Sequence, residues 1–338
     1  MLRGTGALSG HERAMKAEST QRTILTELLA WYDAAGRDLP WRDTRDPYEI
    51  LVSEVMLQQT QVPRVLIHYP AWLERFPTWE SLASAGTAEV IRAWAGLGYN
   101  RRALALQEIA RQIVSRGLPQ SEDEWLQLKG IGPYTAAAMT VFALGKHAVP
   151  IDTNIRRVGA RLLLGLPHPE APGARREGGR RRPDGAIQVA PSGDAQLKPV
   201  LGRFLEGTRR FADLVQALFD LASRVCLKKP LCTTCPLAEA CPVSTGFIEG
   251  RHPAPARTSA ASRERKHRNK PHPDRIFRGR ILRLVREAPA GLGVAGLGPL
   301  IDPAFDPDHD TSWLEAMIRR LADDGLIIRR GERLRLPG

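Results

Sequence analysis

One glutamate stands where apolar neighbours can shield its carboxyl group from water. In the predicted helix PYEILVSEVMLQQTQV, which begins at Pro47, Glu54 shares neighbouring helical rows with Ile50 and Leu57. Such shielding raises the pKa of a carboxyl group, so that it can hold a proton near neutral pH, as a general acid requires. The alternative is a solvated glutamate at the edge of an amphipathic helix. Glu54 is therefore a candidate proton donor.

All four cysteines lie in one short segment. Cys226, Cys232, Cys235 and Cys241 have the spacing C-x5-C-x2-C-x5-C, which is too local to staple distant parts of a fold and is typical of a metal site in an intracellular protein. A zinc ribbon normally has two CxxC pairs, and only one is present. Four thiolates around an iron–sulfur cluster are therefore the better interpretation, with zinc or an unmetallated group of thiols as the alternatives.

A glycine turn between two apolar helices is suited to binding a phosphate. The segment LKGIGPYTAAAM begins at Leu128, and Gly130 and Gly132 can take positive φ angles before Pro133 opens the next helix. The amides of such a turn point outward beside a helix N-terminus, which favours a DNA phosphate as the ligand. Lys129, Gly130 and Gly132 are the candidate contacts, and an ordinary turn is the alternative.

Helices must position these groups, because apolar residues recur at helical spacing through most of the chain. The periodic segments begin near Gln21, Asp46, Asn100, Asp152 and Phe211. The N-terminal end of one of them places Asp152 and Asn154 near a positive dipole end. We therefore expect an all-α core.

Length, composition and charge limit the class of protein. The chain has 338 residues, 43% of them hydrophobic, which is enough for two domains with globular cores. Its formal net charge of +12 favours an acidic polymer as partner, and charge alone does not separate nucleic acid from a membrane surface. No stretch approaches the roughly 18 consecutive apolar residues of a spanning helix, and the N-terminus lacks the apolar run of a signal peptide. We expect a cytoplasmic, nucleoid-associated protein without membrane contact.

The composition divides the chain into four parts. Residues 1–19 are expected to form a flexible tail, 20–243 the helical core, 244–274 a basic linker and 275–338 a small C-terminal module. In the module, two helical patterns precede LIIRRGERLRL, which alternates like a β-hairpin. This order predicts a winged-helix-like module, with a structural cap as the alternative.

Two basic segments stand out. The core is interrupted at 167–197 by a stretch rich in Pro, Gly and Ala, with five arginines between Arg175 and Arg182. We expect an inserted loop that is either solvated or in contact with DNA. From Arg251 to Arg286, twelve Lys and Arg residues stand against two acidic ones, which accounts for most of the net charge of the chain.

Four motifs occur in a fixed order along the predicted core. They are SEVMLQQTQV from Ser53, GLGY from Gly96, GIGPYTA from Gly130 and IDTNIRRV from Ile151. In order and spacing they resemble the MutY-type adenine DNA glycosylases, which form part of the iron–sulfur branch of the helix-hairpin-helix/Gly-Pro-Asp DNA glycosylase superfamily. The resemblance covers about residues 20–242 and is interrupted once.

The resemblance implies a fold and a mechanism. The fold would be all-α, with two lobes and a cleft that receives a flipped base. Glu54 would protonate N7 of the purine, and Asp152 would stabilise the positive sugar left behind. Tyr134 and Asn154 match positions that assist catalysis. Tyr134 lies two places after Gly132, where bifunctional relatives carry a Schiff-base lysine, so base excision without efficient strand cleavage is implied.

The resemblance also implies DNA contacts. Gln58 and Tyr99 match positions that wedge into the base stack and hold a kinked duplex, whereas Lys228 and Lys229 match lysines that meet the phosphate backbone. Aromatic packing and solvated side chains are the alternatives. The implied partner is double-stranded DNA with a mismatched or damaged base pair, bound by a monomer, and no protein partner is indicated.

The cysteine segment departs slightly from the family. The family holds a [4Fe–4S] cluster with four cysteines, and the first gap in this chain, between Cys226 and Cys232, is one residue shorter than usual. The departure leaves the four ligands recognisable and changes the shape expected of the loop.

The implied function is base-excision repair by removal of adenine mispaired with 8-oxoguanine or guanine. The alternatives are a thymine or uracil mismatch glycosylase of the same fold and a non-catalytic iron–sulfur DNA-binding protein. Glu54 in its motif and Asn154 favour adenine, since thymine-specific relatives tend to have Asp where Asn154 stands. Two costly carboxylates argue against a pure binder. The Nudix-like C-terminal domain usual in the family is not recognisable in 275–338.

Overall fold

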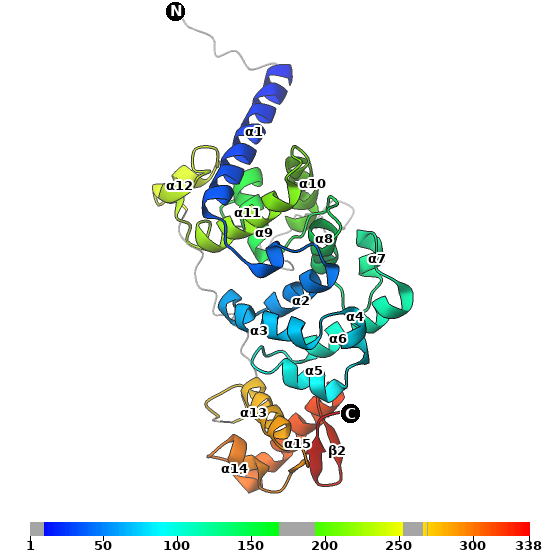
Figure 1. Cartoon of the computed structure of the whole chain (residues 1–338). Helices are drawn as coiled ribbons and strands as arrows, with labels where there is room; N and C mark the ends of the chain where they lie inside the picture. Colours follow the sequence, from blue (N-terminus) through cyan, green and yellow to red (C-terminus); the bar gives the residue numbers. More distant parts are fainter. Residues whose placement is uncertain (1–9, 169–192, 253–265, 269) are drawn as a thin grey trace, which may run out of the picture. The chain divides into compact units, whose positions relative to one another are not determined.

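The computed structural model describes residues 10–168, 193–252, 266–268 and 270–338 (Figure 1). Almost all regular structure in these ranges is helical, as the sequence predicts. The main part of the predicted insertion, residues 169–192, lies outside the described residues. None of the described helices is long and apolar enough to cross a membrane.

The chain folds as two compact units. The first unit contains Met1–Asp38 and Pro133–Arg257, and the second contains Leu39–Gly132 and Thr258–Gly338. The helices of the first unit are α1 (Gly10–Ala35), α8 (Pro133–Phe142), α9 (Thr153–Leu164), α10 (Gly193–Leu205), α11 (Phe211–Arg224) and α12 (Ser244–Ile248).

Three segments of the first unit are helical where the sequence predicted none. Helix α1 begins at Gly10, within the expected tail of residues 1–19. Helix α10 begins at Gly193, before the expected end of the insertion at 197, and α12 lies in the expected linker. Tertiary contacts support two of these helices, because α10 packs on α9 and α1 packs on α11. Arg37 follows the end of α1. Its backbone N and its Nε donate hydrogen bonds of 2.8 and 2.7 Å to the buried Asp220 of α11.

The N-terminal part of the second unit is helical. Its helices are α2 (Pro47–Leu57), α3 (Val62–Arg75), α4 (Trp79–Ser84), α5 (Thr87–Ala93), α6 (Arg101–Arg116) and α7 (Glu122–Leu126). Helix α2 starts as predicted, because Asp46 Oδ1 accepts a 2.7 Å hydrogen bond from the amide of Tyr48. Every residue of α2 from Ile50 to Met56 is buried, and α2 contacts both α3 and α6. A helix buried on all sides can hold a polar side chain away from water.

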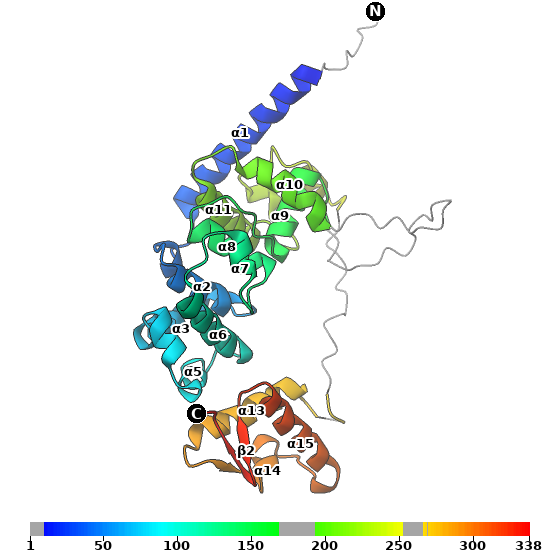
Figure 2. The same ribbon diagram turned by 90° about the vertical axis from the view of Figure 1, so that its right-hand side faces the viewer.

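The C-terminal module has winged-helix topology. Its elements are α13 (Asp274–Glu287), β1 (Leu292–Gly293), α14 (Leu297–Ile301), α15 (Pro307–Asp323), β2 (Ile328–Arg330) and β3 (Arg333–Arg335). The strands form an antiparallel sheet in the order β1-β3-β2, and Arg330 pairs with Arg333 across the hairpin. Figure 2 shows the module in orange and red. The predicted hairpin and the two predicted helices are confirmed.

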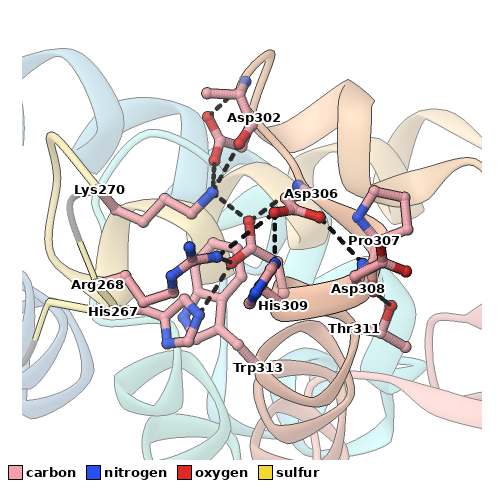
Figure 3. Close-up of polar contacts among 12 residues, drawn as sticks. His267, Arg268, Lys270, Asp302, Asp306, Pro307, Asp308, His309, Thr311 and Trp313 are labelled. Carbon is pink, nitrogen blue, oxygen red and sulfur yellow. Dashed lines mark hydrogen bonds and ion pairs between the residues drawn. The ribbon is translucent and has the colours of Figure 1, made fainter.

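A buried ion-pair network fixes the chain that leads into this module (Figure 3). Lys270 contacts Asp310 and lies 2.6 Å from Asp302 Oδ2, and its Nζ also donates to the carbonyl of Ala304. His267 Nε2 lies 3.0 Å from the fully buried Asp310. Residues 266–268 and 270, expected to belong to a linker, therefore pack against the module. We call this segment the strap.

Asp310 carries its charge in this network down to low pH. Burial alone would raise the pKa of its carboxyl group, but the hydrogen bonds from Lys270 and from the backbone of Asp306 lower the pKa to about 2. Because this pKa lies below the ordinary value for aspartate, the network stabilises the module fully above about pH 4 and loses that contribution as the pH falls toward 2.

Replacing Asp310 with Asn should loosen the module. The substitution takes one carboxylate from the buried Lys270, and breaking a buried ion pair typically costs about 3–5 kcal/mol. Hydrogen–deuterium exchange on the full chain should show the amides of α13 and α15 exchanging at least roughly 100-fold faster than in the wild type. Asp308→Asn, at an exposed position of the same helix, is the control and should leave exchange unchanged. Equal protection in both variants would contradict this role for Asp310.

Candidate functional site

Glu54 lies on the buried helix α2, with only 9% of its surface exposed. Its neighbour Ser53 is also buried and donates a 2.8 Å hydrogen bond to the carbonyl of Ile50. The expectation that the Glu54 side chain is shielded from water therefore agrees with the structure. A carboxyl group that is largely buried from water is suited to proton transfer.

Two loops of the second unit carry the predicted wedge residues. Gln58 is exposed immediately after α2, and Tyr99 is 50% exposed with a φ of 47°, in the left-handed region. A residue other than glycine adopts this conformation only when its surroundings enforce it. The two loops lie together, and Arg102 connects them.

Arg102 joins the two loops through backbone carbonyl groups. Its Nη1 donates to the carbonyls of Val55 and Gln58, at 2.7 and 2.6 Å, and its Nη2 donates to the carbonyl of Gly98 at 3.1 Å. The guanidinium carbon also lies 5.6 Å from the centre of the Tyr99 ring. Burial lowers the pKa of Arg102 to about 10, which leaves it charged at neutral pH.

The sequence analysis missed Arg102, although one signal was available. An arginine in the first turn of α6 stands near the positive end of the helix dipole, where a cation is disfavoured. An arginine at such a position indicates that its guanidinium group pairs with acceptors outside the helix.

The predicted hairpin is present and differs in detail. Gly130 has a φ of 105°, whereas Gly132 does not adopt a positive φ, so the expectation of two such glycines is wrong for Gly132. Helix α7 ends at Leu126, and Gln127 is its C-cap residue. The side chain of Gln112, which the sequence analysis did not single out, accepts a 3.0 Å hydrogen bond from the amide of Lys129.

The hairpin leaves two amides available to a ligand. Among the residues that the structure describes, no acceptor pairs with the backbone N–H of Gly130 or Gly132. Lys129 and Gly130 are exposed. Exposed amides with no acceptor beside a helix N-terminus can bind an anion.

Asp152 is held in one orientation at the start of α9. Its Oδ1 accepts hydrogen bonds from the amides of Asn154 and Ile155, at 2.8 and 2.7 Å, and its Oδ2 accepts one from Asn154 Nδ2 at 2.9 Å. Both oxygens are therefore engaged, and the prediction that Asp152 and Asn154 lie at this dipole end is confirmed.

Arg157 connects this pair to the cysteine segment. Its Nη2 donates to Asn154 Oδ1 at 3.1 Å, and its Nε donates to the carbonyl of Cys226 at 2.8 Å. Burial lowers the pKa of Arg157 below its ordinary value. A shift in the cysteine segment would reach Asp152 through two side chains, Arg157 and Asn154.

The four cysteines are half-buried thiols without disulfide bonds. Burial, and to a smaller extent the charges of the other three cysteines, raise the pKa of Cys235 to about 11. The pKa values of Cys232 and Cys241 are raised for the same reasons, with burial again the main cause. The four sulfurs are therefore close enough to influence one another, as a shared ligand would require. In the described parts of the chain, no three His, Cys, Asp or Glu side chains are placed to bind a single metal ion.

Arg161 holds the backbone of the cysteine segment through hydrogen bonds. It is only 2% exposed and donates to the carbonyls of Leu227 and Lys228, at 2.6 and 3.0 Å, and to Cys226 Sγ at 3.4 Å. Its guanidinium carbon lies 4.7 Å from the centre of the Phe247 ring. The sequence analysis missed Arg161, which can be recognised as a charged residue on the apolar face of a periodic helix.

The remaining predicted residues are accessible. Lys228 and Lys229 are both exposed on the cysteine segment. Tyr134 is half-buried on α8 and packs edge-on against Phe219, with 6.4 Å between ring centres. The first unit thus holds Asp152, Asn154, Tyr134 and the cysteine segment, and the second holds Glu54, Gln58 and Tyr99.

Solved structures and a family model agree with this architecture. Residues 52–178 match the model of the HhH-GPD superfamily base excision DNA repair proteins. The structure of a thermostable thymine-DNA glycosylase aligns with a TM-score of 0.56 and 25% identity, covering 68% of this chain and 98% of that one. A non-covalent endonuclease III–DNA complex, at 18% identity, aligns with a TM-score of 0.51 and supports the fold.

Curated sequences give a closer relationship. An adenine DNA glycosylase of Mycolicibacterium smegmatis is 37% identical over 305 residues, covering 88% of this chain and 93% of that protein. That of Mycobacterium tuberculosis (strain H37Rv) is 35% identical and covers 93% of both chains. The human adenine DNA glycosylase is 37% identical over 62% of this chain and 37% of its own length. This chain belongs to the HhH-GPD superfamily of base excision DNA repair proteins and, within it, to the adenine DNA glycosylase family.

Proposed function

We propose that the protein removes adenine mispaired with 8-oxoguanine or guanine by hydrolysing its N-glycosidic bond. The observation that carries this proposal is the buried Glu54 on α2, in a chain that matches adenine DNA glycosylases along nearly its whole length. The thymine-specific alternative is less well supported, because the structure of that class is 25% identical whereas the adenine-specific relatives reach 37%.

Glu54 acts as the general acid in this proposal. Its carboxyl proton passes to N7 of adenine, so that the bond between N9 and C1′ breaks with the electron pair on a neutral base. Water then adds to C1′ of the sugar cation and gives its proton to the Glu54 carboxylate, which restores the acid. Burial suits Glu54 to this step, because an apolar environment favours the protonated acid before the transfer.

Asp152 stabilises the sugar cation. The three hydrogen bonds that its oxygens accept hold the carboxylate in place before the cation forms, so that little reorganisation is needed during the reaction. Tyr134 stands where a Schiff-base lysine would be needed for strand cleavage, which supports base excision alone. Asn154 assists by fixing one oxygen of Asp152.

Double-stranded DNA with a mismatched or damaged pair is the proposed substrate. The exposed Gln58 and Tyr99 enter the base stack, and the free amides of Gly130 and Gly132, with Lys129, hold a phosphate. Lys228 and Lys229 lie on a second loop able to meet the backbone. Solved structures of endonuclease III bound to DNA share this fold.

The four cysteines are suited to be the ligands of a [4Fe–4S] cluster. The fit rests on four half-buried cysteines in one short segment, none of them in a disulfide bond, and on Arg161, which donates to Cys226 Sγ and would offset thiolate charge. When bound, the cluster would order the loop that carries Lys228 and Lys229. The chain itself fixes the base of that loop through Arg161.

Replacing Glu54 with Gln should abolish adenine release while DNA binding remains. Glutamine keeps the size of the side chain and cannot deliver the proton, so the single-turnover rate should fall at least roughly 1,000-fold. Base release should be measured side by side from duplexes containing A:8-oxoG, A:G, A:C, T:G and U:G. Glu49→Gln on the same helix is the control and should retain activity. Release of thymine or uracil but never adenine, with Glu54→Gln tolerated, would overturn the proposed function.

The purified protein should be brown and contain about four irons per chain, because four thiolates are the usual ligands of such a cluster. Iron and zinc should be quantified after anaerobic purification. Cys232→Ser should lose both the colour and much of the DNA affinity, whereas Thr233→Ser in the same loop should keep them. Stoichiometric zinc without iron would refute the cluster.

Replacing Arg157 with Gln should slow base excision by roughly tenfold, which corresponds to the loss of one hydrogen bond worth about 1.4 kcal/mol. The reason is that Asn154, and through it Asp152, loses a fixed partner. Single-turnover rates should be compared with those of Arg156→Gln. This variant removes the neighbouring arginine, which in the wild type pairs with Asp194 and not with Asn154. Equal rates in the two variants would show that the connection to the cysteine segment is not needed for turnover.

A further inference from the structure

The C-terminal module contains a basic pocket outside the proposed glycosylase site. The pocket has a volume of about 530 Å³ and is lined by residues of α13, α15 and the strap. We propose that it binds a backbone phosphate of duplex DNA, so that the winged-helix module is a second DNA-binding element. This inference rests on the proposed function only in taking DNA as the partner.

Three guanidinium groups line the pocket. Arg275 and Arg278 lie one turn apart on α13, and Arg320 comes from α15. Arg320 is exposed and makes no ion pair with another residue in the described ranges. The planar guanidinium group can donate two parallel hydrogen bonds to a phosphate.

Negative charge in the pocket is limited and already engaged. Asp274 is the one carboxylate among the lining residues, and its Oδ1 accepts a 3.0 Å hydrogen bond from Trp313 Nε1. Asp324 lies 3.9 Å from Arg278 outside the lining. Three lining arginines against one lining carboxylate leave the pocket positive, which selects an anion.

The strap provides a fixed wall for the pocket. The imidazole ring of His267 stacks on the indole ring of Trp313, with 5.0 Å between centres and 10° between planes. Phe277 packs against the same indole ring edge-on at 5.0 Å. The ion pairs of Lys270 with Asp302 and Asp310 hold the strap in this position (Figure 3). A wall that is ordered before binding reduces the entropy lost when the ligand binds.

The surroundings favour a polymer over a small anion. Ser312, Ala316 and Arg320 form an exposed row at i, i+4 and i+8 on α15, the third helix of the winged-helix order. In helix-turn-helix proteins the corresponding recognition helix meets DNA. Arg329 on β2 forms an ion pair with Glu315 of α15, with 2.5 Å between Nη1 and Oε2. This ion pair holds the basic hairpin against the same helix. The exposed Arg330, Arg333 and Arg335 of that hairpin continue the positive charge beyond the pocket, as a DNA backbone requires.

The relatives are consistent with a role for the module. The match to the M. tuberculosis protein covers 93% of this chain, so about 24 residues lie outside it. That number is smaller than the 73 residues from 266 to 338, and the similarity therefore extends into the module.

The test compares two double variants of the full chain. Arg275→Gln/Arg320→Gln removes two pocket charges, and Arg283→Gln/Arg319→Gln removes two exposed charges of the same helices that do not line the pocket. Affinity for an undamaged duplex should be measured over a range of salt concentrations. The pocket variant should bind roughly tenfold more weakly, and its slope of log affinity against log salt should be smaller by about 1, the value for one lost phosphate contact. Equal changes in the two variants, or none, would overturn the proposal.

A second pair tests the pocket by adding charge. Ser312→Glu places a carboxylate among the arginines and should weaken DNA binding at least as much as the double variant does. Thr311→Glu, at the adjacent exposed position outside the pocket, is the control and should weaken binding less. Weakening of equal size in both would show that only the overall charge of the module matters.

Two further measurements separate the possible sources of failure. Binding of inorganic phosphate to the wild type, with DNA affinity unchanged in the pocket variants, would assign the pocket to a small anion and overturn the DNA assignment. Adenine release at saturating DNA should be the same in the pocket variants and the wild type. If the wild type released no adenine from any duplex, the proposed function would fail, while the salt slopes would still decide the pocket.

Discussion

Buried and half-buried cations that donate to backbone carbonyl groups hold the functional loops of this protein. A loop has no helical or sheet ladder to satisfy its carbonyls, and a buried carbonyl without a donor is costly. Arg102 meets this need where the Gln58 and Tyr99 loops converge, and Arg161 meets it under the cysteine segment. Each guanidinium group offers five donors in a fixed plane, so one residue can set the positions of two segments.

This constraint explains how the proposed chemistry can be prepared before substrate arrives. Asp152 accepts three hydrogen bonds at the start of α9, and Asn154 is itself fixed by Arg157. Preorganised charge of this kind contributes more to catalysis than charge that must move into place during the reaction. Arg157 also donates to the carbonyl of Cys226, so the same arrangement connects the carboxylate to the segment proposed to hold the cluster.

The C-terminal module uses the same principle with a lysine. Lys270 is nearly buried and pairs with Asp302 and Asp310, and it also donates to the carbonyl of Ala304. The network orders a strap that composition alone assigns to a linker, since the basic residues around it resemble those of a solvated tail. In the structure the charge of Lys270 is neutralised inside the module, and the arginines of α13 and α15 supply the exposed positive charge instead.

The sequence by itself determined the helical class, the start of α2 at Asp46, the buried Glu54, the hairpin at Gly130 and the winged-helix order, because each depends on local spacing within a few turns. Tertiary structure alone decided the partners of the buried cations and the extra helical segments α10 and the start of α1. Those partners lie far away in sequence: Gln58 is 44 residues from Arg102, and Lys228 is 67 residues from Arg161. Local periodicity carries no information about which distant carbonyl a buried side chain will meet, so only the packed fold could show it.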